Sequence, residues 1–166
     1  MKLGRPAVAD IERVREALRK QRFESAFAWD KNGNLIAARD GDLNNVSVLD
    51  SEWKLLNGGF VLHNHPKGST FSAKDVNRAR EFKLARMEVV TPKETYLLEP
   101  SNRGWSLISD QFWNREILEL LKRQRSRRDD FVRGTISERE LLEALHEDMN
   151  EFRKTVHVRY GRLERR

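Results

Sequence analysis

Apolar residues recur along the chain at two kinds of spacing, and each kind predicts a type of element. A spacing of three or four residues, as in Ile11, Val14 and Leu18, indicates the buried face of a helix. Ser137 and Glu140 have the spacing of a capping box, which marks the start of another helix. The predicted helices are residues 7–22, a short one over 50–56, one that begins at Ser72, residues 110–125, and a last one that begins after Ser137.

Short apolar runs predict strands between these helices. The predicted strands are residues 23–30, 35–39, 60–62, 87–91 and 94–99. Asn32 and Gly33 tolerate the positive φ of a tight turn, so the first two strands should form a hairpin. Because strands and helices alternate irregularly, the pattern predicts an α/β (α+β) fold with a sheet and flanking helices. Gly134 and Thr135 are the expected joint between the last two helices.

The length of 166 residues fits one domain with a helical appendage. We therefore predict a core over residues 1–109 and a C-terminal helical extension over residues 110–166. That extension carries a basic segment and a basic tail.

Composition narrows the chemistry and the location. The chain has no cysteine, which excludes disulfides and thiolate metal sites, so any metal must be held by His, Asp or Glu. Charged residues make up 35% of the chain, and it has neither a long apolar run for a membrane span nor a signal peptide. The expectation is a cytoplasmic protein without a membrane partner.

The net charge of +6 is unevenly distributed along the chain. Residues 23–109 are balanced, and the basic excess lies in the flanks, above all in KRQRSRR at 122–128 and in the tail at 159–166. Such segments can bind phosphate backbones, although arginines on a helix face are more often simply solvated. Nucleic acid is therefore a possible partner, but a less favoured one.

The most informative segment is VLHNHPKGSTFSAKDV, residues 61–76. Side chains two apart in an extended strand point to the same side, so His63 and His65 can both face one ion. Pro66 and Gly68 then turn the chain, so that Asp75 in the first turn of the next helix can supply a third ligand. Three ligands leave a fourth position open on zinc, which is typical of catalytic sites.

Simpler interpretations exist for parts of this segment. A single histidine is usually a surface residue or a hydrogen-bonded core residue. Ser72 and Asp75 alone would be explained as a capping box, with Ser72 as the N-cap and Asp75 at the third helical position. That explanation leaves two histidines at the end of a buried strand unexplained, and capping does not prevent Asp75 from binding a metal.

The segment resembles the signature of the JAMM (JAB/MPN-type) zinc metallopeptidases, His-x-His-Pro followed by Ser-x-x-Asp. The sequence His-Asn-His-Pro is most similar to that of bacterial and phage branches, including RadC-like proteins and phage JAB domains. The resemblance covers about residues 20–108 and implies a cytidine-deaminase-like core with a central mixed β-sheet. It also implies one zinc ion, held by His63, His65 and Asp75. Six residues separate His65 from Ser72, whereas many members have seven, so the loop is one residue shorter.

The family also has a glutamate on an early strand, which serves as general base and then as general acid. Glu24, at the start of the strand over residues 23–30, is the candidate for this position. Glu52, Asp30, Asp40 and Asp42 are weaker candidates, because they lie in an expected surface helix or in turns. The resemblance implies that Ser72 stabilises the oxyanion. Asn64 should point to the opposite side and fix the loop.

These features give three competing functions. The first is a zinc metallopeptidase or isopeptidase that acts on a protein or peptide, or on a lysine conjugate of a ubiquitin-like protein. The second is a RadC-like nucleic-acid-associated protein. The third is a metal-binding or metal-free scaffold that docks through the C-terminal helices in a larger assembly, such as one of phage origin.

Other conspicuous residues have simpler explanations. His146 begins a near match to the zincin motif, but position 150 lacks the second histidine, so no second zinc site is expected. His146 and His157 are expected in the surface helix or tail. The four tryptophans are better explained by core packing than by base stacking, and they are Trp29, Trp53, Trp105 and Trp113.

Overall fold

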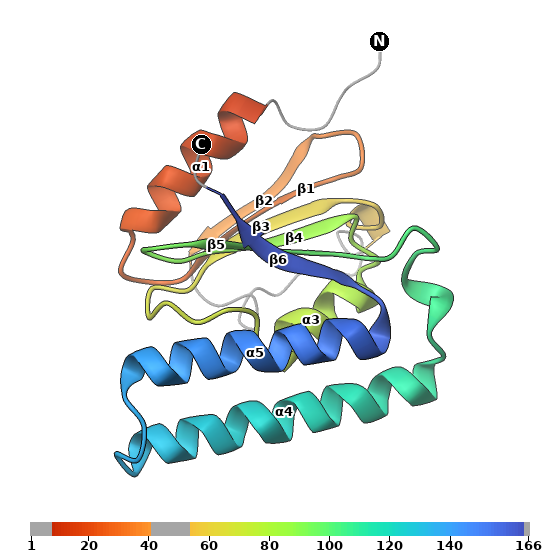
Figure 1. Cartoon of the computed structure of the whole chain (residues 1–166). Helices are drawn as coiled ribbons and strands as arrows, with labels where there is room; N and C mark the ends of the chain where they lie inside the picture. Colours follow the sequence, from red (N-terminus) through yellow and green to blue (C-terminus); the bar gives the residue numbers. More distant parts are fainter. Residues whose placement is uncertain (1–7, 41–53, 165–166) are drawn as a thin grey trace.

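The computed structural model describes residues 8–40 and 54–164. They form helices on both sides of a six-stranded sheet (Figure 1). The α-helices are α1 (Val8–Lys20), α3 (Ala73–Glu81), α4 (Asp110–Val132) and α5 (Glu138–Val156), and a 3-10 turn, η1, covers Trp105–Leu107. The strands are β1 (Ser25–Trp29), β2 (Leu35–Asp40), β3 (Phe60–Asn64), β4 (Arg86–Val90), β5 (Thr95–Glu99) and β6 (Arg159–Leu163).

The sheet is mixed, with the strand order β2-β1-β3-β4-β5-β6. Among the described strands, only β3 and β4 run parallel, and α3 makes the connection between them, as a parallel pair requires. The other neighbouring pairs are antiparallel. The expected fold class, a sheet flanked by helices, is therefore confirmed.

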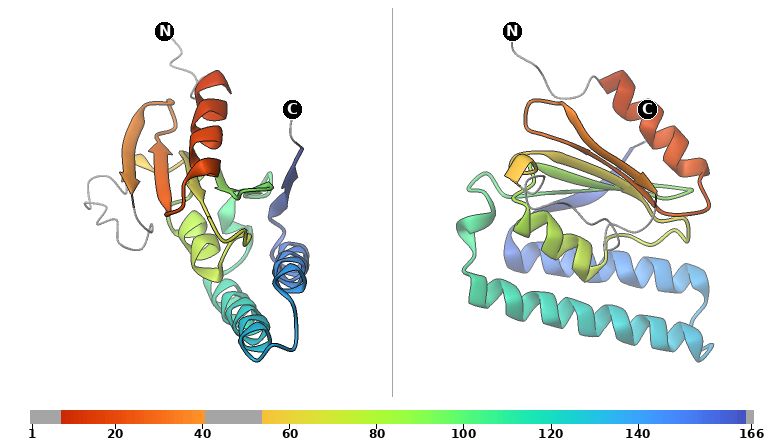
Figure 2. Two further views of the ribbon diagram at one scale, coloured as in Figure 1. Left: turned by 90° about the vertical axis from the view of Figure 1, so that its left-hand side faces the viewer. Right: turned by 180° about the vertical axis from the view of Figure 1, so that it is seen from behind.

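Helices cover the two faces of the sheet unequally. Figure 2 shows α1 alone on one face, while α3 and the antiparallel pair α4 and α5 lie on the other. On the α1 face, Leu18 packs with Trp29, Leu62 and Val90 in a small buried cluster. The larger cluster lies on the other face, so the main hydrophobic core is between the sheet and the helices α3, α4 and α5.

Most predicted elements are present with small changes at their ends. The hairpin turn contains Gly33 with φ of 88°, and Gly134 with φ of 73° lies at the start of the loop between α4 and α5, as their positions predict. The predicted strand over residues 60–62 continues through Asn64, so His63 lies within it. The helix predicted over 110–125 extends to Val132. Most of the short helix predicted over 50–56 lies outside the described residues, as does Trp53.

The main element that the sequence does not predict is β6. Residues 159–163, expected to be a tail, pair with β5 from Glu99↔Arg159 to Thr95↔Leu163. The C-terminal segment also supplies a large part of the main core. Its fully buried members include Trp113, Leu120, Met149 and Phe152. Residues 110–164 are thus continuous with the sheet and its core. None of the described helices has the length and apolar content needed to cross a membrane.

Candidate metal centre

The centre lies where β3 ends and α3 begins. His63 is the fourth residue of β3, and His65 follows directly after the strand, where its backbone N–H donates to the carbonyl of Val90. The chain then turns at Gly68, whose φ is 90°, and returns to Ser72, the N-cap of α3. Asp75 is the third residue of that helix, so its carboxylate points back toward the two histidines. The carboxyl ends of parallel strands are common binding positions in such sheets.

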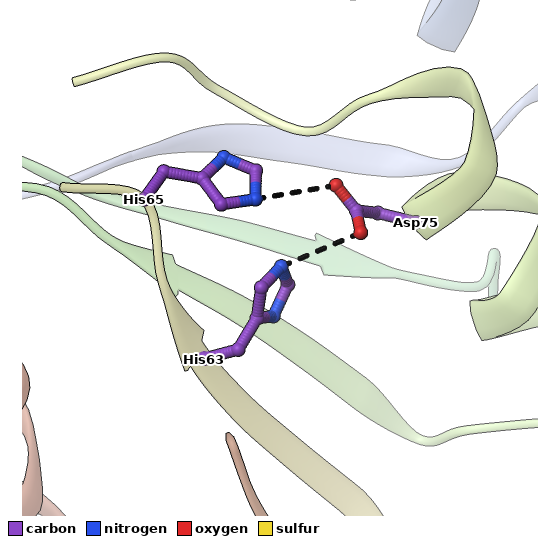
Figure 3. Close-up of side chains that lie close together, drawn as sticks. All are labelled: His63, His65 and Asp75. Carbon is purple, nitrogen blue, oxygen red and sulfur yellow. Dashed lines mark ion pairs between the residues drawn. The ribbon is translucent and has the colours of Figure 1, made fainter. Parts of the chain in front are cut away.

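Figure 3 shows the three side chains converging on one point. His63 Nε2 lies 3.5 Å from Asp75 Oδ1, and His65 Nε2 lies 3.5 Å from Asp75 Oδ2. One potential ligand atom from each residue lies within 4.8 Å of the others. Ligands about 2.0–2.2 Å from a tetrahedral ion are separated by roughly 3.5 Å, so these spacings fit a metal. His63, His65 and Asp75 are positioned to bind a metal ion.

The hydrogen bonding of the two histidines also fits metal binding. His65 Nδ1 lies 3.0 Å from the carbonyl of Ser69 and 3.1 Å from that of Thr70, so this nitrogen carries the hydrogen. The lone pair is therefore on Nε2, which faces Asp75. His63 is buried, and apart from the 3.5 Å contact of Nε2 with Asp75 Oδ1 neither of its ring nitrogens has a hydrogen-bond partner among the described residues. A buried nitrogen without a partner is costly, and a metal on Nε2 would remove that cost for one of them.

The charge states that metal binding needs are favoured at neutral pH. Burial lowers the pKa of the His65 imidazole below its ordinary value, against the opposing pull of the Asp75 carboxylate and, more weakly, of Glu24. Burial acts to raise the pKa of Asp75, but its interactions with His63 and His65 and a backbone hydrogen bond from Ser72 bring it well below the ordinary value. A neutral imidazole and a carboxylate are the forms that bind cations.

Ser72 forms the predicted capping box with Asp75. Its Oγ accepts a hydrogen bond from Asp75 N at 3.1 Å, and both Ser72 N and Oγ donate to Asp75 Oδ2 at 2.8 Å. The hydroxyl therefore points to the carboxylate and not freely into a cleft. Since Ser72 already uses Oδ2, Oδ1 is the oxygen better able to bind a metal.

Glu24 lies beside the three converging residues without being one of them. Glu24 directly precedes β1, and in that strand Ala26 pairs with His63. The Glu24 carboxylate accordingly acts to raise the pKa of His65. Of the weaker candidates, Asp30 caps the hairpin turn and Asp40 accepts a hydrogen bond from Ser25 Oγ, while Asp42 and Glu52 lie outside the described residues.

Asn64 faces away from the two histidines that flank it, as expected. Its Oδ1 accepts from the backbone N–H of Ser25 at 2.6 Å, and its Nδ2 donates to the carbonyl of Phe23 at 2.9 Å. A third, longer bond joins Nδ2 to the carbonyl of Leu18. Asn64 therefore fixes the backbone on both sides of Glu24.

Two residues that contact the centre's loop are absent from the sequence prediction. Gln124 of α4 is buried and hydrogen-bonds to the backbone of Phe71 and Ala73. Tyr160 of β6 is also buried, and its hydroxyl lies 2.8 Å from Thr70 Oγ1. Gln124 could have been found, because it continues the four- and three-residue spacing of Trp113, Ile117 and Leu120. The arginines around it obscure that pattern.

The structure also places most of the other conspicuous residues. His146 is half-buried and bonds to Tyr160 through Nδ1 at 2.6 Å, so it is more than a surface residue, while His157 is exposed. Trp29 and Trp113 are buried, and Trp105 packs against the core. In the basic segment, Lys122 pairs with Glu119 and Arg127 with Asp148, and a role in binding nucleic acid stays a prediction.

No family model matches the sequence, and none of the curated proteins matches it either.

Proposed function

We propose that this protein is a zinc-dependent hydrolase of peptide or lysine isopeptide bonds. The observation that carries the proposal is the convergence of His63, His65 and Asp75, with Glu24 beside His65. Three nitrogen and oxygen ligands without cysteine suit zinc, and they leave a position for water. The His-x-His-Pro and Ser-x-x-Asp signature, which resembles that of the JAMM metallopeptidases, supports the same conclusion.

A bound zinc ion would supply a Lewis acid, lowering the pKa of a bound water and polarising the scissile carbonyl. Glu24 would accept the proton from that water and deliver it to the leaving amine. Asn64 would keep the Glu24 backbone in place through its bonds to Phe23 and Ser25. Ser72 would hold Asp75 in the free protein, and its hydroxyl would have to leave Asp75 Oδ2 to donate to the oxyanion.

A cavity next to the loop after His65 is a candidate place for the substrate. This cavity of about 540 Å³ lies between the loop that follows His65, the turn between β4 and β5, and the first two turns of α5. The residues that line it include Pro66, which directly follows His65, and both acidic and basic side chains. A cavity of this volume can hold a few residues of an extended protein tail or of a ubiquitin-like conjugate, as it can hold a small molecule.

The decisive experiment compares the zinc-loaded protein with its Glu24→Gln variant on peptides and lysine-linked conjugates. We expect the variant to lose at least about 100-fold in hydrolysis rate, which is the lower range for general acid–base catalysis, while it keeps its zinc. Glu81→Gln is the control, because Glu81 is an exposed glutamate that pairs with Arg78 at the end of α3. Hydrolysis that is unchanged in Glu24→Gln, or absent for every substrate with the wild type, would contradict the proposal.

A further inference from the structure

The geometry of the metal centre depends on a short segment, residues 69–73, that joins the histidines to α3. The carbonyls of Ser69 and Thr70 orient the His65 ring, and the side chain of Phe71 lies against His63 with ring centroids 6.3 Å apart. Ser72 then caps α3 and holds Asp75. A shift in this segment would move all three ligands relative to one another.

Gln124 holds this segment on both sides of Ser72. Its Oε1 accepts from the backbone N–H of Ala73 at 2.9 Å, and its Nε2 donates to the carbonyl of Phe71 at 2.9 Å. Ala73 N–H is one of the first N–H groups of α3, which have no partner within the helix. Gln124 therefore completes the cap that Ser72 begins, although it lies 51 residues away in the sequence.

Tyr160 holds the same segment from the sheet. Its hydroxyl lies 2.8 Å from Thr70 Oγ1 and 2.6 Å from His146 Nδ1, and its ring meets Phe71 edge-to-face with centroids 6.1 Å apart. The carbonyl of the same Thr70 faces His65 Nδ1. Thr70 thus links the Tyr160 hydroxyl directly to His65.

Packing alone does not explain these two side chains. Gln124 is only 1% exposed and lies on a helix face that otherwise buries Trp113 and Leu120, where an apolar residue would avoid the cost of burying an amide. Both polar ends of the amide are instead used, and both bonds go to the segment that carries Ser72. The tyrosine hydroxyl is directed to that segment in the same way.

We infer that Gln124 and Tyr160 are positioning residues of the metal centre, and that the C-terminal segment, residues 110–164, maintains the centre's geometry. This inference rests on the proposed zinc site. The C-terminal residues would not touch the ion. They would act through residues 69–73, by holding His65 and Asp75 at the spacing that one ion requires.

The test measures Zn²⁺ affinity of the full chain by competition with a chelator. Gln124→Met keeps a straight side chain of similar size and removes both hydrogen bonds, and we expect zinc affinity to fall about 10- to 100-fold. Tyr160→Phe removes one hydroxyl, and we expect a loss of about tenfold. Should Gln124→Met fail to fold, as judged by circular dichroism, Tyr160→Phe decides the question.

Each variant has a matched control. Tyr96 stacks on Tyr160 with an interplanar angle of 2°, but its hydroxyl donates to Glu94 and not to the loop, so Tyr96→Phe should leave zinc affinity unchanged. Leu120→Val, one turn before Gln124, perturbs the core without removing a bond to the loop.

The outcomes separate this inference from the proposed function. Wild-type affinity in both test variants, or an equal loss in the controls, would overturn the positioning role and leave the zinc site intact. A wild-type protein that binds no zinc would overturn the zinc site and this inference with it.

Discussion

Two serines begin helices in the same way, and the residue three positions later decides what else each can do. Ser72 forms a capping box with Asp75, and Ser137 forms one with Glu140. Glu140 lies on the surface, whereas Asp75 faces two histidines. The same local motif therefore stabilises a helix in both places, and only at Ser72 does it also orient a metal ligand.

Replacing each serine separates these two contributions. Ser72→Ala and Ser137→Ala should both destabilise the protein, by about 1 kcal/mol for a lost N-cap, as measured by denaturant unfolding. Only Ser72→Ala should also weaken zinc binding, by about tenfold or more, since it removes the hydrogen bonds that Oγ exchanges with Asp75. Equal zinc affinity in the two variants would show that Ser72 acts as a cap alone.

At the residue scale, the sequence predicts the three converging residues well. It does not predict the residues that hold them in place. His63, His65 and Asp75 can be found because the alternation of a strand and the start of a helix are local patterns. The role of Asn64 also follows from alternation. Gln124 and Tyr160 reach the site only through tertiary packing, which no local pattern in the segment 61–76 contains.

At the scale of elements, the predictions succeed where the periodicity is local. The hairpin of β1 and β2, the strand β3 and the starts of α3 and α5 all carry turn or capping signals in the sequence. α4 is longer than predicted. The run of arginines near its end has no apolar spacing to indicate a helix, but arginine itself favours helices. β6 has the polar sequence RYGRL, and its extended form depends on pairing with β5.

The parallel pair β3 and β4 explains why the site forms where it does. A parallel connection needs a crossover element, and here that element is α3. The end of β3 and the start of α3 are therefore joined by a short loop, and the groups on both are brought together. The six residues between His65 and Ser72 are enough for His65 and Asp75 to meet.

At the scale of the whole molecule, the two predicted parts of the chain share one sheet and one core. β6 covers the edge of β5, and α4 and α5 cover the face on which α3 lies. The sequence predicts the helical pair as an extension of a core over residues 1–109. The apolar residues of this pair are buried beside α3 and under the sheet, which indicates that the fold of residues 1–109 depends on them.

This dependence predicts that residues 1–109 alone will not fold. Such a chain would expose the surface that Trp113, Leu120, Met149 and Phe152 cover, and it would leave β5 as an unpaired edge. We expect circular dichroism to show no cooperative thermal transition, with or without added zinc. A cooperative transition for this fragment would instead support an independent core.

The central claim is that one zinc ion binds at His63, His65 and Asp75, and metal analysis after dialysis against trace zinc tests it most directly. His157→Asn is the control for His63→Asn, because His157 is exposed and has the positive φ that asparagine tolerates. We predict about one zinc per chain in the wild type and in His157→Asn, and none retained in His63→Asn. A wild type without stoichiometric zinc, or full retention in His63→Asn, would contradict the account.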